Sequence, residues 1–162
     1  MAFKSGTGTI QRFFEITPQT LELSFTGNSA SAETANFNTN VSTSATHVLC
    51  DIFVTRSTYA SPPVTDHQNY VFGRSGQVGN HKNWVDGRGQ QPSGQFSNMA
   101  ANIIILTQNG ESDGYGDNYG LWYSSQIMPT SGRTFYWNNF GNSGSSGWIF
   151  IKYRGYYESE GN

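Results

Sequence analysis

Aromatic residues make up a large part of this chain, while the residues that favour helices are scarce. The sequence contains 11 Phe, 9 Tyr and 4 Trp, but only 5 Leu, 8 Ala and 3 Lys. Ala, Leu and Lys are strong helix formers, whereas aromatic residues are enriched in strands. The composition therefore argues against a helical bundle or coiled coil and predicts an all-β fold.

Charged residues are also scarce. They make up 12% of the chain, about half of the ~25% that is usual in soluble domains. Disordered chains show a different balance, with many charges and few aromatic residues. The chain is therefore predicted to fold with a polar surface of low charge, and its 162 residues fit one domain.

The charge pattern also argues against several classes of partner. The net charge is −2 and the nine Lys and Arg residues are spread singly along the chain, whereas nucleic-acid binding needs a concentrated basic face. No apolar run approaches the ~20 residues of a membrane-spanning helix, and the N-terminus shows no secretion signal. We expect no nucleic-acid partner and no membrane insertion. Because Cys50 is the single cysteine, we expect packing, within one chain or between copies, to hold the fold together.

Short runs with strand character alternate with Gly, Asn, Ser and Pro. Residues 19–26 alternate apolar and polar side chains, which is typical of a half-buried strand. Residues 46–57 carry apolar side chains on both faces, which predicts a central strand or one covered by a partner. Residues 30–45 suit an edge strand or a loop, and further strands are expected within 67–72, 95–108, 121–127, 133–138 and 147–157. About eight strands with long loops predict a β-sandwich or jelly roll.

The last of these strands carries two basic residues on one face. Trp148, Phe150, Lys152 and Arg154 alternate with apolar residues of the opposite face. Charged side chains are common at exposed strand edges. We therefore expect this strand to lie near an edge of its sheet or at an interface.

The first 17 residues are predicted to form an N-terminal arm, followed by a single β-sandwich domain over residues 18–162. The arm carries Ile10, Phe13 and Phe14, whose i, i+3, i+4 spacing suits one helical turn that Pro18 would end. Two alternatives are open. The arm packs over the core of its own chain, or it reaches a neighbouring subunit.

No motif for catalysis or metal binding is found. The three histidines are scattered, no G-x-S-x-G sequence is present, and a thiol such as Cys50 on a core strand behaves as a small apolar group. Carboxylates are present, but glycosidase chemistry needs two of them facing one cleft, and residues 111–118 lack the spacing of an EF-hand. We expect no enzymatic activity, no metal and no cofactor.

The strongest remaining indication of a binding site is the occurrence of aromatic side chains next to polar ones. They occur around Trp84 and in the segment that contains Tyr115, Asp117, Tyr119 and Trp122. Such residues suit a glycan, whose rings stack on aromatic faces, and they equally suit a protein interface. They are also compatible with aromatic residues of the sandwich core, so three alternatives stay open.

Distal domains of tail fibres and tailspikes have segments of similar composition to three segments of this chain, residues 46–55, 66–73 and 148–153. The whole chain, with its Asn/Ser/Thr/Gly-rich strands, many aromatic residues, few Lys and one Cys, resembles small virion-surface proteins of tailed bacteriophages. That resemblance implies a structural virion protein. It is expected to be a homotrimeric capsid decoration (cement) protein that binds several copies of the major capsid protein. The alternative is a receptor-binding tip or lectin-like module that binds host surface glycans.

The resemblance implies a location on the capsid exterior, after synthesis in the host cytoplasm without a signal peptide. Decoration is preferred because the chain shows no shaft of the kind that a fibre needs. The candidate sites form three groups: Phe3, Ile10, Phe13 and Phe14 for contact with the capsid or another subunit; Arg74 and Trp84 for the trimer interface; and Tyr115, Asp117, Tyr119 and Trp122 for glycan binding.

Overall fold

The computed structural model of the chain describes residues 2–4, 10–26, 33–57, 67–74, 103–108, 118–140 and 146–160. Every regular element in these ranges is a β-strand, which confirms the all-β fold. The strands are β1 (Ala2–Lys4), β2 (Ile10–Thr26), β3 (Glu33–Asn36), β4 (Ala45–Ser57), β5 (His67–Gly73), β6 (Ile103–Gln108), β7 (Asn118–Pro129), β8 (Thr134–Phe140) and β9 (Ser146–Ser159).

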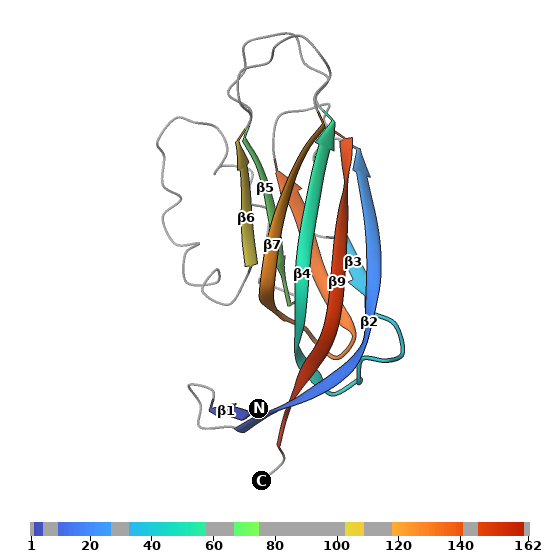
Figure 1. Ribbon diagram of the computed structural model, residues 1–162, viewed down its shortest axis with the longest axis vertical. Coiled ribbons are helices and arrows are strands. Elements are labelled where there is room, and N and C mark those ends of the chain that lie inside the picture. The colour runs from blue at the N-terminus through green and yellow to red at the C-terminus, as the bar shows by residue number, and fades with distance from the viewer. Residues whose placement is uncertain are drawn as a thin grey trace.

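Two sheets form a sandwich (Figure 1). The five-stranded sheet has the order β1-β2-β9-β4-β7, and the four-stranded sheet has the order β3-β8-β5-β6. Strand β2 pairs with β9, β3 with β8, β4 with β7 and β5 with β6, all antiparallel. The chain is therefore one long hairpin of four strand pairs, rolled so that successive pairs alternate between the sheets. This is the topology of a jelly roll, as the sequence predicted.

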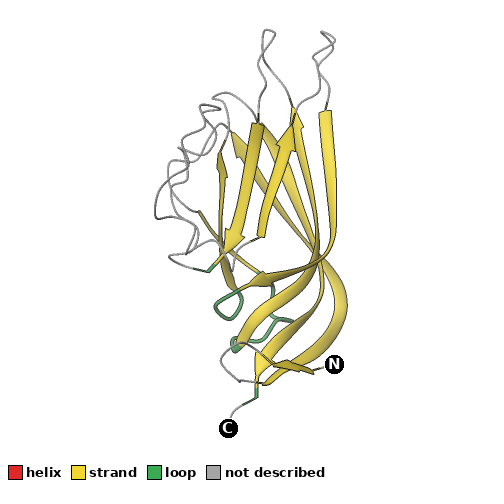
Figure 2. Cartoon of the chain, turned by 90° about the vertical axis from the view of Figure 1, so that its left-hand side faces the viewer, coloured by secondary structure: helices red, strands yellow, loops and turns green. Residues whose placement is uncertain are grey.

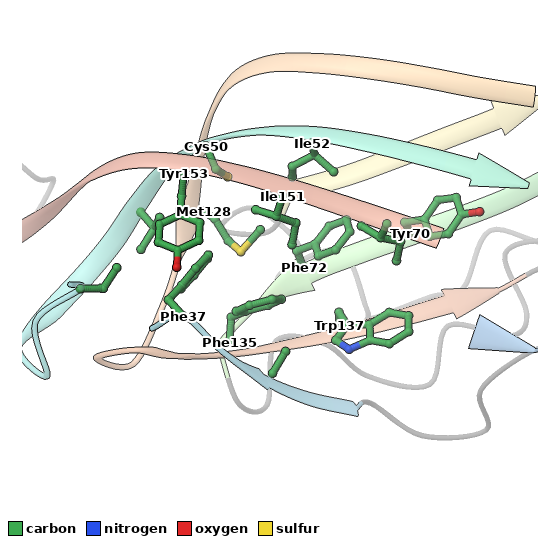
Figure 3. Packing of buried hydrophobic residues seen from close by; sticks show 14 of the residues in the cluster. Phe37, Cys50, Ile52, Tyr70, Phe72, Met128, Phe135, Trp137, Ile151 and Tyr153 are labelled. Atoms are coloured by element: carbon green, nitrogen blue, oxygen red, sulfur yellow. The ribbon is translucent and has the colours of Figure 1, made fainter. Parts of the chain in front are cut away.

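The core lies between the sheets because side chains alternate along each strand. On β4, Val48, Cys50, Ile52 and Val54 are buried. The four-stranded sheet and the loop after β3 face them mainly with aromatic residues. The ring centroids of Phe37 and Phe135 lie 4.9 Å apart, and those of Phe37 and Tyr153 lie 4.7 Å apart (Figure 3). Much of the aromatic content thus forms the core.

The strand positions agree well with the sequence pattern, with one exception. The segment 46–57 is β4, which lies between β9 and β7, as a central strand should. Strand β3 lies at an edge of the four-stranded sheet, which is one of the two alternatives for residues 30–45. Strand β9 is not an edge strand, because it pairs with β2 on one side and with β4 on the other; the alternative, that residues 147–157 lie at an interface, stays a prediction.

The structure corrects the form expected for the N-terminal arm. Residues 10–17 are extended and belong to β2, which pairs with β9 on both sides of Pro18. The register shifts between Glu15 and Gln19. A proline cannot donate a ladder hydrogen bond, so a bulge accommodates it where a helical turn was expected. The boundary expected after residue 17 therefore falls inside a strand. That residues 18–162 form a single domain stays a prediction.

Replacement of a core aromatic side chain should destabilise the fold strongly. Phe135 is fully buried between Phe37 and Phe72, so Phe135→Ala leaves a cavity that these rings fill only partly. We expect the free energy of unfolding to fall by about 3–5 kcal/mol, as measured by urea denaturation. The matched control is Trp122→Ala, at an exposed aromatic residue, with an expected loss of about 1 kcal/mol or less. Equal losses would contradict this assignment of the core.

Candidate functional site

Aromatic side chains line up across the outer face of the five-stranded sheet. Phe53 of β4 alternates with the buried residues and therefore points away from the core. It lies opposite Trp122 of β7 and Phe150 of β9. The ring centroids of Phe53 and Trp122 lie 5.7 Å apart, and those of Phe53 and Phe150 lie 6.2 Å apart. We call Trp122, Phe53 and Phe150 the aromatic row.

The aromatic row is open to solvent at one end. Trp122 is 56% exposed, and Trp148, which precedes Phe150 by two residues on β9, is 45% exposed. Phe53 and Phe150 are partly exposed. Single exposed apolar residues need no explanation, but neighbouring ones on one face are typical of an interaction surface. The outer face is therefore a candidate binding surface.

A hydrogen-bonded cluster centred on Asp51 lies next to the aromatic row. The backbone amide of Ser125 donates to Asp51 Oδ1 at 2.7 Å, and Arg154 Nη1 donates to Asp51 Oδ2 at 2.8 Å. Arg154 Nη2 also donates to Ser125 Oγ at 2.9 Å. The carboxylate thus connects β4 to both neighbouring strands. We call Asp51, Ser125 and Arg154 the Asp51 cluster.

The Asp51 cluster lies where three strands shift register. Between β4 and β7, the partners of Cys50 and Ile52 are Gln126 and Tyr123, so two residues of β7 face Asp51 alone. One of them, Ser125, has a φ of 55°. Arg154 is the extra residue of a second shift, between β4 and β9. A bulge leaves backbone groups outside the ladder, and here Asp51 supplies the acceptor for the Ser125 amide.

The hydrogen-bond partners of Asp51 stabilise the ionised form of its carboxyl group. Partial burial by itself would raise the pKa of this carboxyl. The Ser125 amide and the Arg154 guanidinium outweigh that effect, with a further contribution from Lys152, and lower the pKa. Asp51 is therefore ionised at neutral pH, and its hydrogen bonds are charge-assisted.

A second candidate surface is formed by the strand ends at the two chain termini. We define the tongue as β1 together with residues 10–15 of β2 and 155–159 of β9. It lies at the end of the molecule where the N- and C-termini come together (Figure 1), and the long strands bend as they enter it (Figure 2). Ile10 is 47% exposed there.

The tongue has an aromatic packing of its own. Phe14 stacks on Tyr156, with ring centroids 5.2 Å apart, and Phe13 lies against Tyr157 at 5.0 Å. The guanidinium carbon of Arg12 lies 5.0 Å from the centre of the Phe14 ring, which is the geometry of a cation–π contact. These contacts keep β2 and β9 together beyond the bend.

Hydrogen bonds connect the tongue to the sandwich. The hydroxyl of Thr46 donates to Gln11 Oε1 at 2.6 Å, and Gln11 Nε2 donates to the Ser159 hydroxyl at 2.7 Å. Arg74, which follows β5, donates to the backbone carbonyls of Thr46 and Thr130 at 2.7 and 2.8 Å. The tongue is thus bound to β4 through Thr46, and Arg74 connects the end of β5 to the same residue and to Thr130.

The residues expected to contact a capsid lie in the tongue. Phe3 belongs to β1; its side chain is outside the described part of the structure. Phe13 and Phe14 pack on Tyr157 and Tyr156 of the same chain, and the two alternatives, an arm over the core of its own chain or one that reaches a neighbouring subunit, stay open. Ile10 is exposed. A contact with a capsid or another subunit stays a prediction.

The residues predicted for the trimer interface and for glycan binding are described only in part. Arg74 makes the hydrogen bonds given above, and its role in a trimer stays a prediction. Trp84, Tyr115 and Asp117 lie outside the described residues. Tyr119 pairs with Arg56 in the β4–β7 ladder, and its side chain is not described. Of the four residues predicted to bind a glycan, Trp122 is the one whose side chain the structure places.

The aromatic row could not be recognised as a group from the sequence. The alternation of side chains predicts that Trp148 and Phe150 share one face of their strand and that residues 46–57 carry apolar side chains on both faces. The alternation of side chains was therefore visible. The neighbours across strands depend on the register, which the alternation does not specify.

The two remaining features to consider are a metal site and a membrane-spanning helix. Within the described ranges, no group of three or more His, Cys, Asp or Glu side chains is placed to hold a metal ion. No helix in the same ranges is long and apolar enough to cross a membrane.

Removal of the charge at position 51 should reduce stability in a pH-dependent way. Because the pKa of Asp51 is lowered in the folded chain, its contribution is full above the ordinary carboxyl pKa of about 4. It is lost as the pH falls through the lowered value. Asp51→Asn should lower the free energy of unfolding at pH 7 by about 1–2 kcal/mol. Denaturation between pH 2 and 7 should show a smaller acid-induced loss than in the wild type.

The control is Glu22→Gln, which alters an exposed carboxylate on the same sheet. We expect this variant to follow the wild type across the pH range. An Asp51→Asn variant that also follows the wild type would mean that the Asp51 cluster contributes nothing to stability.

Comparison with known proteins does not identify a family for this chain. A scan against protein-family models and a search of curated proteins found no match. Among solved structures, one similar chain comes from a structure entitled Desmodium yellow mottle tymovirus. It is 10% identical, with 91% of each chain covered and a TM-score of 0.30. The assignment of a jelly roll therefore relies on the strand order of this chain itself.

Proposed function

We propose that this chain is a structural virion protein and that it acts as a capsid decoration protein. The resemblance to virion-surface proteins of tailed bacteriophages suggests this role, and double-sheet jelly rolls are a common architecture of viral capsid domains. The observation that carries the proposal is the tongue, a strand extension at one end of the sandwich that has its own aromatic packing; Ile10 is the exposed apolar residue described on it.

An ordered tongue is well suited to attachment. A disordered arm loses conformational entropy when it binds, and this loss reduces its affinity. Residues 11–15 already pair with β9, and Ile10 pairs with Lys4 of β1; the aromatic contacts of Phe13 and Phe14 hold the segment there. A capsid subunit could therefore dock against Ile10 and its surroundings with a small entropic cost.

Trimer formation would strengthen this attachment. A homotrimer offers three tongues to several copies of the major capsid protein at once, so weak individual contacts combine into a strong overall affinity. Binding to the assembled shell then opposes its dissociation by mass action. We place the protein on the exterior of the capsid.

We propose no catalytic role. Burial, with a smaller contribution from the neighbouring charge of Asp51, raises the pKa of the Cys50 thiol. The thiol therefore stays protonated at neutral pH, and the thiolate is the reactive form of cysteine. Cys50 is fully buried in the core between the sheets, which supports a packing role.

Capsid binding tests both the function and the tongue. Purified protein should co-sediment with capsids of its own virus from which the native copies have been removed. Ile10→Asp should weaken this binding at least tenfold, because a charge replaces the apolar contact. Ile127→Asp is the matched control, since Ile127 is 44% exposed on β7, outside the tongue, and it should bind as the wild type does.

The possible failures of this experiment have different meanings. A wild-type chain that does not bind capsids would contradict the decoration function. A chain that binds, with Ile10→Asp binding equally well, would keep the function and refute the contact through the tongue.

The oligomeric state is a separate prediction. Multi-angle light scattering of the purified chain should give three times the 17.9 kDa of one chain, because the proposed attachment depends on several tongues in one particle. The mass should stay constant when the protein is diluted over a wide range. A monomer at high concentration would contradict the trimer.

A further inference from the structure

The aromatic row crosses the strands. Trp122, Phe53 and Phe150 come from three adjacent strands, one residue from each, and face each other in the ladders. The planes of neighbouring rings are tilted by 44° and 34°. The three rings therefore form a continuous apolar strip about as wide as one side chain.

Polar side chains flank this strip. On one side, at the level of Trp148, the register places Thr55 and Ser24. The Thr55 hydroxyl accepts a hydrogen bond from the Trp148 amide at 3.1 Å. On the other side, Lys152 lies between Asp51 and Thr20. The aromatic row is thus bordered on one side by Trp148 with the hydroxyl groups of Thr55 and Ser24, and on the other side by the polar side chains of Asp51, Lys152 and Thr20.

Among the side chains that the structure describes, the charges around the strip balance. Glu22 lies opposite Phe150 in the β2–β9 ladder, and Asp51 adds a second negative charge. Lys152 and Arg154 supply two positive charges, and Arg154 is paired with Asp51 at 2.8 Å. A ligand with a strong charge of either sign would meet a like charge on this face. The face therefore complements a neutral ligand with apolar and hydrogen-bonding parts.

Sugar rings have this combination of properties. Their C–H faces stack on aromatic rings, and their hydroxyl groups point sideways toward hydrogen-bonding partners. The distances of 5.7 and 6.2 Å between the rings of the row would let successive sugar units of an extended chain stack on successive rings. We propose that the outer face of the five-stranded sheet binds a neutral polysaccharide chain that runs across β7, β4 and β9.

The proposal assigns a role to each part of the face. Trp122, as the most exposed ring, provides the main stacking surface at the β7 end. Phe53 and Phe150 extend this surface toward the centre of the sheet. Lys152 and Ser24, both exposed, are available to the hydroxyl edges of the chain. This surface is separate from the tongue, so the proposal does not depend on capsid binding.

Affinity electrophoresis of the full-length protein tests the proposal. The gels contain one of three neutral polysaccharides (dextran, mannan or laminarin) or the anionic polygalacturonate. At least one neutral polysaccharide should slow the protein, with the intrinsic tryptophan fluorescence changing in the same titration. At equal concentration, the retardation of the protein by polygalacturonate should be at least tenfold weaker than that by the neutral polysaccharide. Retardation by polygalacturonate alone, or by none of the four, would overturn the proposal.

Two variants locate the site. Trp122→Ala should weaken polysaccharide binding at least tenfold, and cooperative thermal unfolding with a midpoint within a few degrees of the wild type would show that the fold is intact. Ile127→Ala, an exposed apolar residue of the same strand, should bind as the wild type does. Equal binding by both variants would refute the site.

The Ile10→Asp variant separates this proposal from the decoration function. It should bind polysaccharide normally even where it no longer binds capsids. If Trp122→Ala instead abolished capsid binding and left polysaccharide binding unchanged, the outer face would be a protein interface, and the proposal would be wrong.

Discussion

The carboxylate of Asp51 holds the five-stranded sheet together where its ladders are irregular. It accepts hydrogen bonds from the Ser125 amide of β7 and the Arg154 guanidinium of β9, and both residues lie at register shifts. A bulge gives up a ladder hydrogen bond and bends its strand. Asp51 compensates two bulges at once, because an ionised carboxylate can accept several hydrogen bonds from different directions.

The bulges decide which side chains reach the surface. Residues an even number of positions apart share one face of a regular strand, yet Trp122 is exposed while Met128 is fully buried. The extra residue at Ser124–Ser125 reverses the alternation between them. On β9, by contrast, the buried residues Ile149, Ile151, Tyr153 and Tyr157 all stay at odd-numbered positions, and Tyr156 is only partly buried against the core. The aromatic row and the tongue thus lie on either side of the same bend.

The fold could be predicted from the sequence better than either surface. Alternation identified the strand in 46–57 and both faces of 147–157, because burial on one side is a local property of the pattern. Pro18 signalled an interruption, but a helix end and a bulge both accommodate a proline, and only pairing with β9 decides between them. Asp51 and Ser125 are 74 positions apart, so the hydrogen bond that sets the register of β7 has no local signal. Without that register, Phe53 could not be placed beside Trp122.

The high aromatic content of the chain also has more than one explanation, and the sequence alone does not separate them. Phe37, Phe135 and Tyr153 fill the core, and Phe13 and Phe14 stabilise the tongue against β9. Packing within the chain therefore explains the presence of these rings, and no binding function is needed for them. The aromatic row is different, because part of its surface stays exposed. Its ring contacts across β7, β4 and β9 stabilise the sheet, but the exposed face of Trp122 makes none of them. The low net charge of the chain is compatible with the neutral ligand that we propose for this face.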